Sequence, residues 1–409
     1  MHALTLLIAA GVAVAAPASN KPQPVKNIQV GPRPFWLVDQ MEDSPLKTEL
    51  ASCSEKPIRN APFFSISHRG GPVQFPEHTR EGLYAGARMG AGVLECDVAF
   101  TSDRQLVCRH SQCDLHTTTN ILLIPELAAK CTTPFQPATE DSDATAKCCT
   151  SDITHEEFLS LCAKMDSSNP KATTPEEYQY GGPDWRTSLY DNCATTIDHK
   201  TFIEITDSLG LQFTPELKTP EVEMPFQGEY TQEMYAQQLI DEYKEAGISP
   251  RRVWPQSFLE DDVLYWVNAE PAFGKQAVYL DPRVDTAEGY EVAVENMQCL
   301  YDQGVRVMAP PIFALLNTSA DGEIVPSSYA DAANEAGMTL VTWSLERSGP
   351  LKQAAEAGEY YISTVADVIK GDGDMYRIVD ALARKVGVKG IFSDWPATVT
   401  YYANCIGLK

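Results

Sequence analysis

The sequence is poor in positive charge. Its 409 residues include 32 lysines and arginines against 56 aspartates and glutamates, which gives a net charge of −24 at pH 7. Such an acidic surface repels the phosphates of nucleic acids and of anionic membranes, so neither is expected as a partner. An anionic substrate would have to be attracted by positive charge concentrated in one place.

Long apolar segments are missing beyond the N-terminus. Residues 1–15 have a short apolar core that ends in Ala-x-Ala, and the segment before it lacks a strong positive charge. This core is too short to span a bilayer comfortably and is typical of a cleaved secretory signal. No later stretch of the sequence is apolar enough to cross a membrane. We therefore predict a secreted protein, extracellular or associated with the cell wall, without stable membrane insertion.

Cysteine, in contrast, is not scarce. The 11 cysteines would be unusual in a reducing compartment and fit secretion, as does the glycosylation sequon Asn317-Thr318-Ser319. An odd number of cysteines leaves at least one thiol unpaired in a monomer. We expect this thiol to be Cys96, because a cysteine at the centre of a buried strand is commonly a small apolar filler.

Short internal repeats and low-complexity tails are absent, and the length suits one α/β barrel, expected over residues 61–409, that carries an insertion. Residues 16–60 form a Pro-rich, polar N-terminal extension whose one apolar island, residues 32–38, is expected to pack on the barrel. Residues 111–201 contain six cysteines and few periodic runs. They predict a disulfide-stapled insertion, which we expect to form one wall of the substrate entrance.

Apolar, β-prone runs alternate with helical patterns along the rest of the chain. The helical patterns are clearest at residues 232–246, 287–303 and 329–336. Eight runs are expected to be strands: those that end at Ser67 and Val98, and residues 211–217, 252–258, 276–280, 305–309, 338–343 and 388–393. Eight strands separated by helices predict a TIM (β/α)8 barrel, with the insertion after the second strand region.

Polar clusters stand at the downstream ends of several of these runs. His68 and Arg69 directly follow the first run, and His110 ends a further apolar run that begins at Leu106. The carboxyl ends of parallel strands converge on the pocket of an α/β fold, so these side chains are expected to share one site.

Carboxylates occupy the second run. Glu95 and Asp97 lie two positions apart, so their side chains face the same way, and Glu216 and Lys218 repeat the spacing in a later run. Two carboxylates on one face of a buried strand need a cation, a proton or solvent. Three of them supply the hard oxygen ligands that suit Ca²⁺ or Mg²⁺, and a secreted setting favours Ca²⁺. Two histidines could then act as general acid and base at a phosphoryl centre whose oxygens Arg69 and Lys218 neutralise.

Several motifs carry a family resemblance. In chain order they are His68-Arg69-Gly70, Pro76-Glu77-x-Thr79, Gly90-Ala91-Gly92 followed by Glu95-x-Asp97-Val98 and Thr101-x-Asp103, Leu106-Val107-x2-His110, Glu216-Leu217-Lys218, and Ser393-Asp394-Trp395-Pro396. From about residue 63 to residue 402 the chain resembles the glycerophosphodiester phosphodiesterase family. The resemblance implies a TIM barrel, a divalent cation, and cleavage of glycerophosphodiesters to glycerol phosphate and an alcohol. It also implies Glu95, Asp97 and Glu216 as metal ligands and His68 and His110 as the acid/base pair.

The sequence departs from this family at three positions. Ser111, His78 and His116 stand where the family usually has aspartate, asparagine and arginine. None is an expected metal ligand, so the reaction type is expected to survive and the positioning of the substrate to change. We expect His78 and His116 to be solvated loop residues.

Other strand-end residues complete the expected site. Gln256 and Trp343 are expected to bind substrate, and Asp394 to brace the site or cap the following helix. The acidic run of residues 260–262 reads as a helix start rather than as a metal cluster.

Three other functions remain open from the sequence. A sphingomyelinase D-like phospholipase or lyase would share the barrel and the two histidines. An acid glycosidase would use paired carboxylates, but Glu95 and Asp97 lie only about 6 to 7 Å apart along one strand beside a histidine and an arginine. A catalytically inactive secreted binding protein would account for the three departures from the family pattern.

Overall fold

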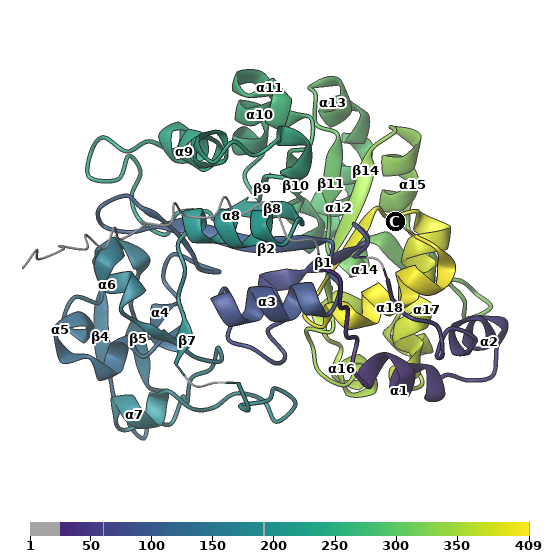
Figure 1. The fold of residues 1–409 in the computed structure, drawn as a ribbon, viewed down its shortest axis with the longest axis horizontal. Helices are drawn as coiled ribbons and strands as arrows, with labels where there is room; N and C mark the ends of the chain where they lie inside the picture. Colours follow the sequence, from purple (N-terminus) through teal and green to yellow (C-terminus); the bar gives the residue numbers. More distant parts are fainter. Residues whose placement is uncertain (1–24, 60, 191–192, 409) are drawn as a thin grey trace, which may run out of the picture.

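The computed structural model of the chain describes residues 25–59, 61–190 and 193–408 (Figure 1). The expected secretory signal lies outside the described residues. Among those that are described, no helix has both the length and the apolar character needed to cross a membrane.

A closed barrel of parallel strands forms the centre of the fold. β1 pairs with both β15 and β2, which closes a sheet in the order β1, β15, β14, β11, β10, β9, β8, β2. The strands are β1 (Ser65–Ser67), β2 (Val93–Phe100), β8 (Gln212–Leu217), β9 (Gln256–Ser257), β10 (Val278–Leu280), β11 (Val307–Ala309), β14 (Thr339–Leu345) and β15 (Gly390–Ser393). All eight overlap the expected runs, so the prediction of a TIM barrel is confirmed. β3 (Leu106–Cys108) is not a barrel strand but turns back antiparallel to β2.

Apolar side chains fill the barrel, and helices surround it. The interior cluster consists of Ile66, Val93, Val278, Leu280, Val307, Ala309, Val341 and Phe392. The larger helices are α3 (Arg80–Arg88), α8 (His199–Ser208), α9 (Gln232–Glu245), α10 (Glu260–Ala269), α12 (Ala287–Glu295), α13 (Met297–Asp302), α15 (Ser328–Glu335), α16 (Leu351–Ala357), α17 (Met375–Asp380) and α18 (Pro396–Ile406). The helical pattern at residues 287–303 is therefore interrupted at Asn296, and residues 260–262 begin α10 as expected.

The turn after β1 explains two of the sequence motifs. The Thr79 hydroxyl accepts a hydrogen bond from the Gly82 N–H at 3.1 Å and so caps the N-terminus of α3. Gly70 has a φ of +86°, and a Cβ atom there would lie 2.9 Å from the Gly82 backbone. Only glycine allows this left-handed turn to pack so closely on α3, which fixes where His68 and Arg69 emerge.

The N-terminal extension packs against the end of the barrel, as expected. Its helices α1 (Arg33–Asp39) and α2 (Pro45–Ala51) contact α18, and Leu37 and Val38 are buried in the main core. A disulfide between Cys53 and Cys405 joins this extension to α18.

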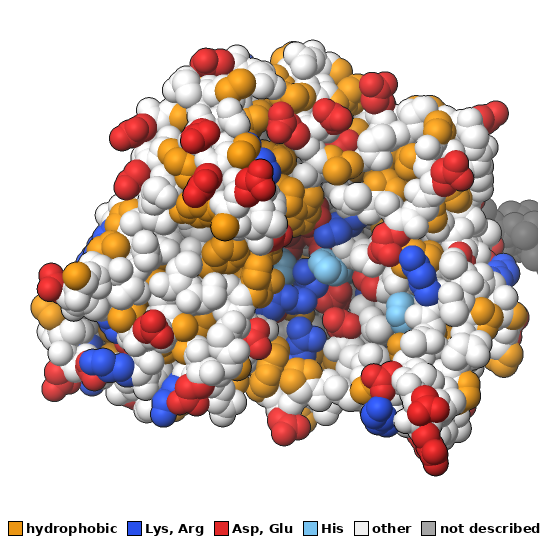
Figure 2. All heavy atoms as spheres, turned by 180° about the vertical axis from the view of Figure 1, so that it is seen from behind, with side chains coloured by type: hydrophobic (Ala, Val, Ile, Leu, Met, Phe, Trp, Pro, Cys, Tyr) orange, Lys and Arg blue, Asp and Glu red, His pale blue; other side chains and the backbone are white. Residues whose placement is uncertain are grey.

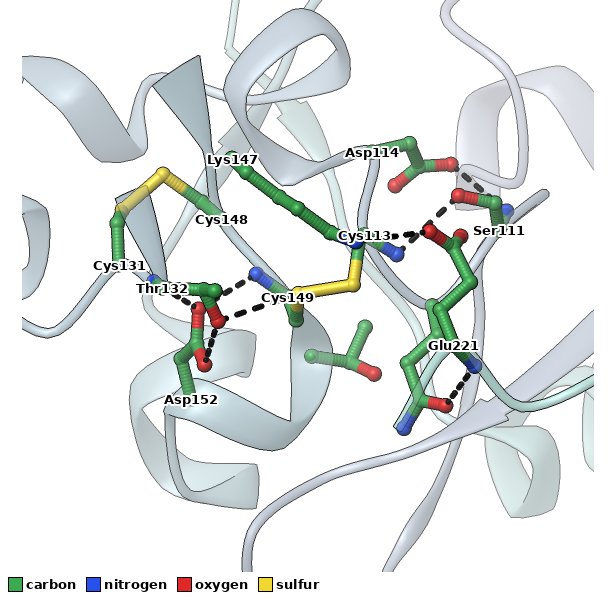
Figure 3. Close-up of a disulfide and its surroundings, with 12 residues drawn as sticks. Ser111, Cys113, Asp114, Cys131, Thr132, Lys147, Cys148, Cys149, Asp152 and Glu221 are labelled. Carbon is green, nitrogen blue, oxygen red and sulfur yellow. Dashed lines mark hydrogen bonds and ion pairs between the residues drawn. A yellow bond between two sulfur atoms is a disulfide. The ribbon is translucent and has the colours of Figure 1, made fainter. Parts of the chain in front are cut away.

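The cysteine-rich insertion lies beside the barrel (Figure 1). It has its own apolar core, which includes Leu115, Ile121 and Phe158, and two small antiparallel sheets, β4 (Thr133–Gln136) with β5 (Thr145–Lys147) and β6 (Cys162–Ala163) with β7 (Ala194–Thr195). Its short helices are α4 (Leu115–Thr118), α5 (Pro125–Ala128), α6 (His155–Leu159) and α7 (Pro175–Tyr178). Its six cysteines pair with one another, as Cys113–Cys149 and Cys131–Cys148 (Figure 3) and as Cys162–Cys193. The prediction of a disulfide-stapled insertion is confirmed.

The expected free thiol is wrong. Cys96 forms a disulfide with Cys108, because the antiparallel pairing of β3 with β2 brings their Cα atoms to 5.3 Å. Cys299, which is exposed, is the free cysteine of the described part of the chain. Asn317, the first residue of the sequon, is exposed in β12 (Leu316–Thr318).

Candidate active site

A pocket of about 280 Å³ opens at the carboxyl ends of the barrel strands. Figure 2 shows a hollow in this region of the surface in which basic and histidine side chains gather, with hydrophobic side chains at its edge. The pocket is lined by His68, Arg69, Glu95, His110, Glu216, Lys218, Gln256, Phe258, Leu280, Trp343, Arg347, Tyr361 and Phe392. Every residue expected to act as acid or base, to bind substrate or to bind the metal is among them except Asp97, which is buried and lies directly beside Glu216 in the sheet register.

The three carboxylates meet in one cluster. Glu95, Asp97 and Glu216 each offer an oxygen within 4.8 Å of the others, and all three are buried. Glu95 accepts hydrogen bonds from the Arg69 backbone N–H at 2.8 Å and from Gln256 Nε2 at 3.0 Å, which leaves the cluster rigidly placed. Asp97 Oδ1 is buried and has no hydrogen-bond partner among the described residues. An orphaned carboxylate oxygen in an oxygen-only donor set fits a hard divalent cation.

The electrostatics of this cluster also fit a bound divalent cation. Burial, together with the charges of Asp97 and Glu216, raises the pKa of Glu95 well above its usual range. Burial likewise raises the pKa of Glu216 to about 8, although Lys218 Nζ lies 2.5 Å from its carboxylate. Three carboxylates this close repel one another, and a bound cation would offset that repulsion.

His78 is not the solvated loop residue that we expected. It is fully buried, and its Nε2 lies 2.9 Å from Asp97 Oδ2. His78 has a φ of +54°, and its backbone N–H donates to the Arg69 carbonyl at 3.0 Å, so the turn after β1 folds it under the carboxylates. The sequence offers one indication that His78 belongs to the site, which is its position inside the Pro-Glu-x-Thr motif.

His116 also differs from the expectation, in another way. It is half-buried within the insertion, where its Nδ1 accepts a hydrogen bond from the Cys148 backbone N–H at 3.4 Å. It is not among the residues that line the pocket. Its role in the described structure is to support the fold of the insertion.

His68 is held by an acidic partner. Its Nδ1 lies 2.5 Å from Asp394 Oδ1 and 2.9 Å from Ser344 Oγ, and Arg347 Nη1 donates to Asp394 Oδ2 at 2.9 Å. Asp394 therefore braces the histidine and does not cap α18. The first of our two expectations for this residue is confirmed. Burial lowers the pKa of His68 to about 4 against the opposing effect of Asp394, so the imidazole is neutral at pH 7 with its Nδ1 proton on the Asp394 side.

His110 enters the same pocket from β3. Burial and the nearby charges of Arg69 and Lys218 lower its pKa well below the ordinary value, so it too is neutral. The neighbouring Arg109 backbone N–H donates to the Asp97 carbonyl at 2.7 Å. This bond and the Cys96–Cys108 disulfide tie the strand of His110 to the strand of the carboxylates.

Two features of the pocket were missed by reasoning from the sequence. Arg347, which follows β14, adds a third basic side chain to Arg69 and Lys218, and no motif marks it. The pocket also has an apolar side, to which Phe258 and Tyr361 contribute. Phe258 follows β9 directly, so the strand-end rule could have found it, whereas Tyr361 lies far from any strand.

The insertion does not form a wall of this pocket. No described residue of 111–201 is among the lining residues. The insertion instead touches the rim, where the Thr187 N–H donates to the Val73 carbonyl at 3.3 Å and Trp185 packs on Gly349. It is also tied to the chain after β8 by an ion pair between Lys147 and Glu221 at 3.4 Å (Figure 3). The expectation of an entrance wall is wrong for the pocket itself because the insertion packs beside the β2–β3 hairpin.

Comparisons with known proteins place the chain in a family. Residues 68–398 match the model of the glycerophosphoryl diester phosphodiesterase family. A protein of Arthroderma benhamiae named only as an extracellular protein is 54% identical over 245 residues, which are 60% of this chain and all of that protein.

A solved structure shares the fold. A Silicibacter pomeroyi protein provisionally named a glycerophosphoryl diester phosphodiesterase superposes with a TM-score of 0.55 at 15% identity, over 84% of this chain and 94% of that one. A glycerophosphodiester phosphodiesterase of Agrobacterium tumefaciens gives a TM-score of 0.46 at 13% identity, over 82% of this chain and 98% of that one. The family match spans most of the chain and includes both histidines and all three clustered carboxylates. The chain belongs to the glycerophosphoryl diester phosphodiesterase family, whose members are phosphoric diester hydrolases.

Proposed function

We propose that this chain hydrolyses glycerophosphodiesters to glycerol phosphate and an alcohol, with His68 and His110 as the acid/base pair. The observation that carries the proposal is the meeting, in one pocket, of the carboxylate cluster, two histidines and three basic side chains. The basic groups suit the two negative oxygens that a phosphodiester acquires in its transition state.

The residues suggest a division of labour. Arg69, Lys218 and Arg347 bind the phosphoryl oxygens and hold the phosphorus in front of the histidines. Because Asp394 keeps the proton of His68 on Nδ1, Nε2 can accept a proton from the attacking hydroxyl. The new P–O bond forms as the P–O bond to the alcohol breaks, and the departing oxygen takes a proton from the imidazolium form of His110, which the negative charge of the bound phosphodiester stabilises. If a glycerol hydroxyl attacks first, a cyclic phosphate forms, and water opens it in a second step.

Glu95, Asp97 and Glu216 would hold a divalent cation, and we propose Ca²⁺ rather than Mg²⁺, because Ca²⁺ tolerates irregular oxygen sites. Such a cation supplies Lewis-acid polarisation of the phosphoryl oxygens. Gln256 supports the site by orienting Glu95 through their hydrogen bond of 3.0 Å. Trp343 forms part of the surface on which the substrate rests.

The location follows from the same set of observations. The described chain contains disulfides both in the barrel and in the insertion. These bonds persist in an oxidising environment, and the relative from Arthroderma benhamiae is named as extracellular. We propose that the protein is secreted.

The test is turnover of a panel of glycerophosphodiesters by the purified full chain, first after chelation and then with single metals restored. His68→Ala should lose about 10²-fold or more in kcat, because an acid/base group is removed. His155→Ala is the matched control, since His155 lies in α6 of the insertion and pairs with Asp198 at 2.9 Å, outside the pocket. Full activity of folded His68→Ala would reject the assignment, and full activity after exhaustive chelation would reject the role of the cation.

A further inference from the structure

His110 takes part in a second polar cluster, which is distinct from the three clustered carboxylates. Glu77, His110 and Asp114 each offer a nitrogen or oxygen atom, and these atoms lie within 4.8 Å of one another. Glu77 and Asp114 are not among the residues that line the pocket. The His110 ring makes no direct hydrogen bond or ion pair with any residue that the structure describes. We call these three residues the His110 cluster.

The spacing of the His110 cluster suits a shared water molecule. Three atoms at that limiting separation surround a point about 2.8 Å from each of them, which is the length of a hydrogen bond to water. Bonds from a cation to nitrogen or oxygen ligands are shorter, about 2.0 to 2.6 Å.

Arg109 adds a second reason to expect water here. Burial lowers the pKa of its guanidinium against the attraction of Asp114 and Glu77, so its positive charge lies near the His110 cluster and repels a cation. Arg109 is fully buried, and none of its three guanidinium nitrogens has a hydrogen-bond partner among the described residues. Buried donors of this kind are commonly satisfied by ordered water.

Asp114 is fixed by the turn that follows β3. Its Oδ2 accepts a hydrogen bond from the Ser111 backbone N–H at 3.0 Å (Figure 3). Its Oδ1 accepts a hydrogen bond from Thr118 Oγ1 at 3.3 Å. The whole residue is only 8% exposed. The carboxyl group therefore keeps its place relative to the His110 ring.

The charges around Asp114 leave its carboxyl group partly protonated at neutral pH. Burial raises the pKa of Asp114 to about 7, against the attraction of Arg109. The negative charges of Glu77 and Asp166 add to the increase. Burial lowers the pKa of His110 well below its ordinary value. A proton shared between these two side chains therefore rests on Asp114 before substrate binds.

We propose that Asp114 is a positioning residue that acts through His110: it keeps a proton beside the ring and passes it to His110, by way of a shared water molecule, when His110 protonates the departing alcohol. This inference rests on the proposed function, which makes His110 the acid.

The proton transfer balances. Asp114 gives its proton to one ring nitrogen of His110, which becomes the imidazolium. The other ring nitrogen gives its proton to the departing oxygen as the P–O bond breaks. His110 is then neutral again, and Asp114 is a carboxylate that Arg109 stabilises. The resting state returns when the proton that His68 has accepted is exchanged, through solvent, for the one that Asp114 has given.

The test compares two substrates that differ in their need for an acid. Choline leaves glycerophosphocholine as an alkoxide that must take up a proton, whereas p-nitrophenolate leaves the p-nitrophenyl ester of glycerol phosphate without one. Single-turnover cleavage of both is measured with the full chain and a divalent cation. Asp114→Asn keeps the size of the side chain but cannot supply the proton. It should cleave glycerophosphocholine about 10- to 100-fold more slowly than the parent and the p-nitrophenyl ester within about twofold of the parent.

The ratio of the two rates also reports the ionisation of Asp114. Both substrates use the same base and the same cation, so the effects of pH on those groups cancel in the ratio. In the parent, the rate for glycerophosphocholine relative to the p-nitrophenyl ester should fall as the pH rises through about 7, where Asp114 loses its proton. In Asp114→Asn this ratio should be low and independent of pH. An Asp114→Asn ratio equal to that of the parent at every pH overturns the inference.

Asp166→Asn is the control for a general loss of negative charge. Asp166 also acts on Arg109 but lies outside the His110 cluster, so this variant should match the parent on both substrates. A selective loss as large as that of Asp114→Asn overturns the inference. If Asp114→Asn does not fold, Thr118→Val takes its place, because it removes the side-chain hydrogen bond to Asp114 Oδ1. It should slow glycerophosphocholine cleavage selectively, and an equal effect on both substrates overturns the inference.

His110→Ala separates this inference from the proposed function. It should slow the cleavage of glycerophosphocholine far more than that of the p-nitrophenyl ester, because it removes the acid itself. If His110→Ala is selective in this way and Asp114→Asn is not, the inference is overturned and the proposed function stands. If His110→Ala slows both substrates equally, His110 is not the acid, and both the inference and that assignment are rejected.

Discussion

Replacing Asp394 by asparagine tests the geometry of the candidate site most directly. The two oxygens of Asp394 serve two donors, His68 Nδ1 at 2.5 Å and Arg347 Nη1 at 2.9 Å. Asparagine has one oxygen and one NH₂ group, and a guanidinium can only donate hydrogen bonds. The oxygen of Asp394→Asn should therefore turn to Arg347 and the NH₂ group to His68. The histidine must then accept at Nδ1 and carry its proton on Nε2, where it cannot act as a base.

The magnitude follows from that tautomer change. A charge-assisted hydrogen bond is worth about 1.5–3 kcal/mol, or about 10- to 10²-fold in rate, and a wrong tautomer in a comparable histidine–carboxylate pair costs about 10⁴-fold. We expect kcat to fall about 10²- to 10⁴-fold with little change in KM. Ser344 Oγ, 2.9 Å from His68 Nδ1, can accept the proton in part, so addition of Ser344→Ala should lower kcat further.

The assay is steady-state kinetics on glycerophosphocholine together with ¹⁵N NMR of the histidine rings, which reports the tautomer independently of turnover. Circular dichroism shows whether the variant is folded. A folded Asp394→Asn protein with kcat within threefold of the parent would refute the reasoning, as would a His68 ring that keeps its proton on Nδ1.

Three further predictions concern other parts of the molecule. His78→Ala should weaken divalent-cation binding about 10- to 100-fold in calorimetry, because it removes the contact with Asp97. His78→Asn should retain most of the affinity. An equal loss of cation affinity in the two variants would contradict this prediction. Burial raises the pKa of Asp262 to about 6, above the 3.8 of an unfolded chain, so ionisation of this carboxyl costs stability as the pH rises through this range. In urea unfolding, Asp262→Asn should therefore gain up to about 3 kcal/mol at pH 8 and almost nothing at pH 3. A gain that does not depend on pH would count against this reasoning. Replacing Cys131 and Cys148 by alanine should lower the stability of the insertion by about 3 kcal/mol, the value for a loop of this length, and should leave the activity of the barrel intact. Limited proteolysis measures the stability of the insertion, and turnover measures the activity. Loss of activity in parallel with loss of stability would contradict an insertion that folds independently.

The barrel and the centre of its site were predictable because local patterns encode them. Each strand reads as a short apolar run, and a parallel barrel brings the ends of such runs to one rim. The two-residue spacing of Glu95 and Asp97 places both on one face, and the alignment of β2 with β8 adds Glu216. Turn chemistry at Gly70 and Thr79 accounts for the intervening motif.

The missed features depend on contacts between distant segments. Arg347 belongs to the site because it meets Asp394, 47 positions later, and no local pattern records that meeting. Cys96 looked like a core filler because β3 was read as another strand end, whereas its antiparallel return to β2 makes Cys108 a neighbour. His78 sits in a loop by sequence, and only the fold of the turn after β1 buries it. The insertion lies beside the barrel instead of over the pocket because its own core and disulfides hold it together as a separate body.

The disulfide between Cys53 and Cys405, whose sequence separation is 352, turns most of the polypeptide into a closed loop. The seam of the barrel, where β1 meets β15, lies inside this loop. A protease that cuts once at any exposed connection between the two cysteines would therefore release no fragment: the nicked protein would run as one species until reductant is added. In a secretory environment rich in proteases, such a chain can survive a cut in a surface connection, because both halves of the barrel stay tethered within reach of each other.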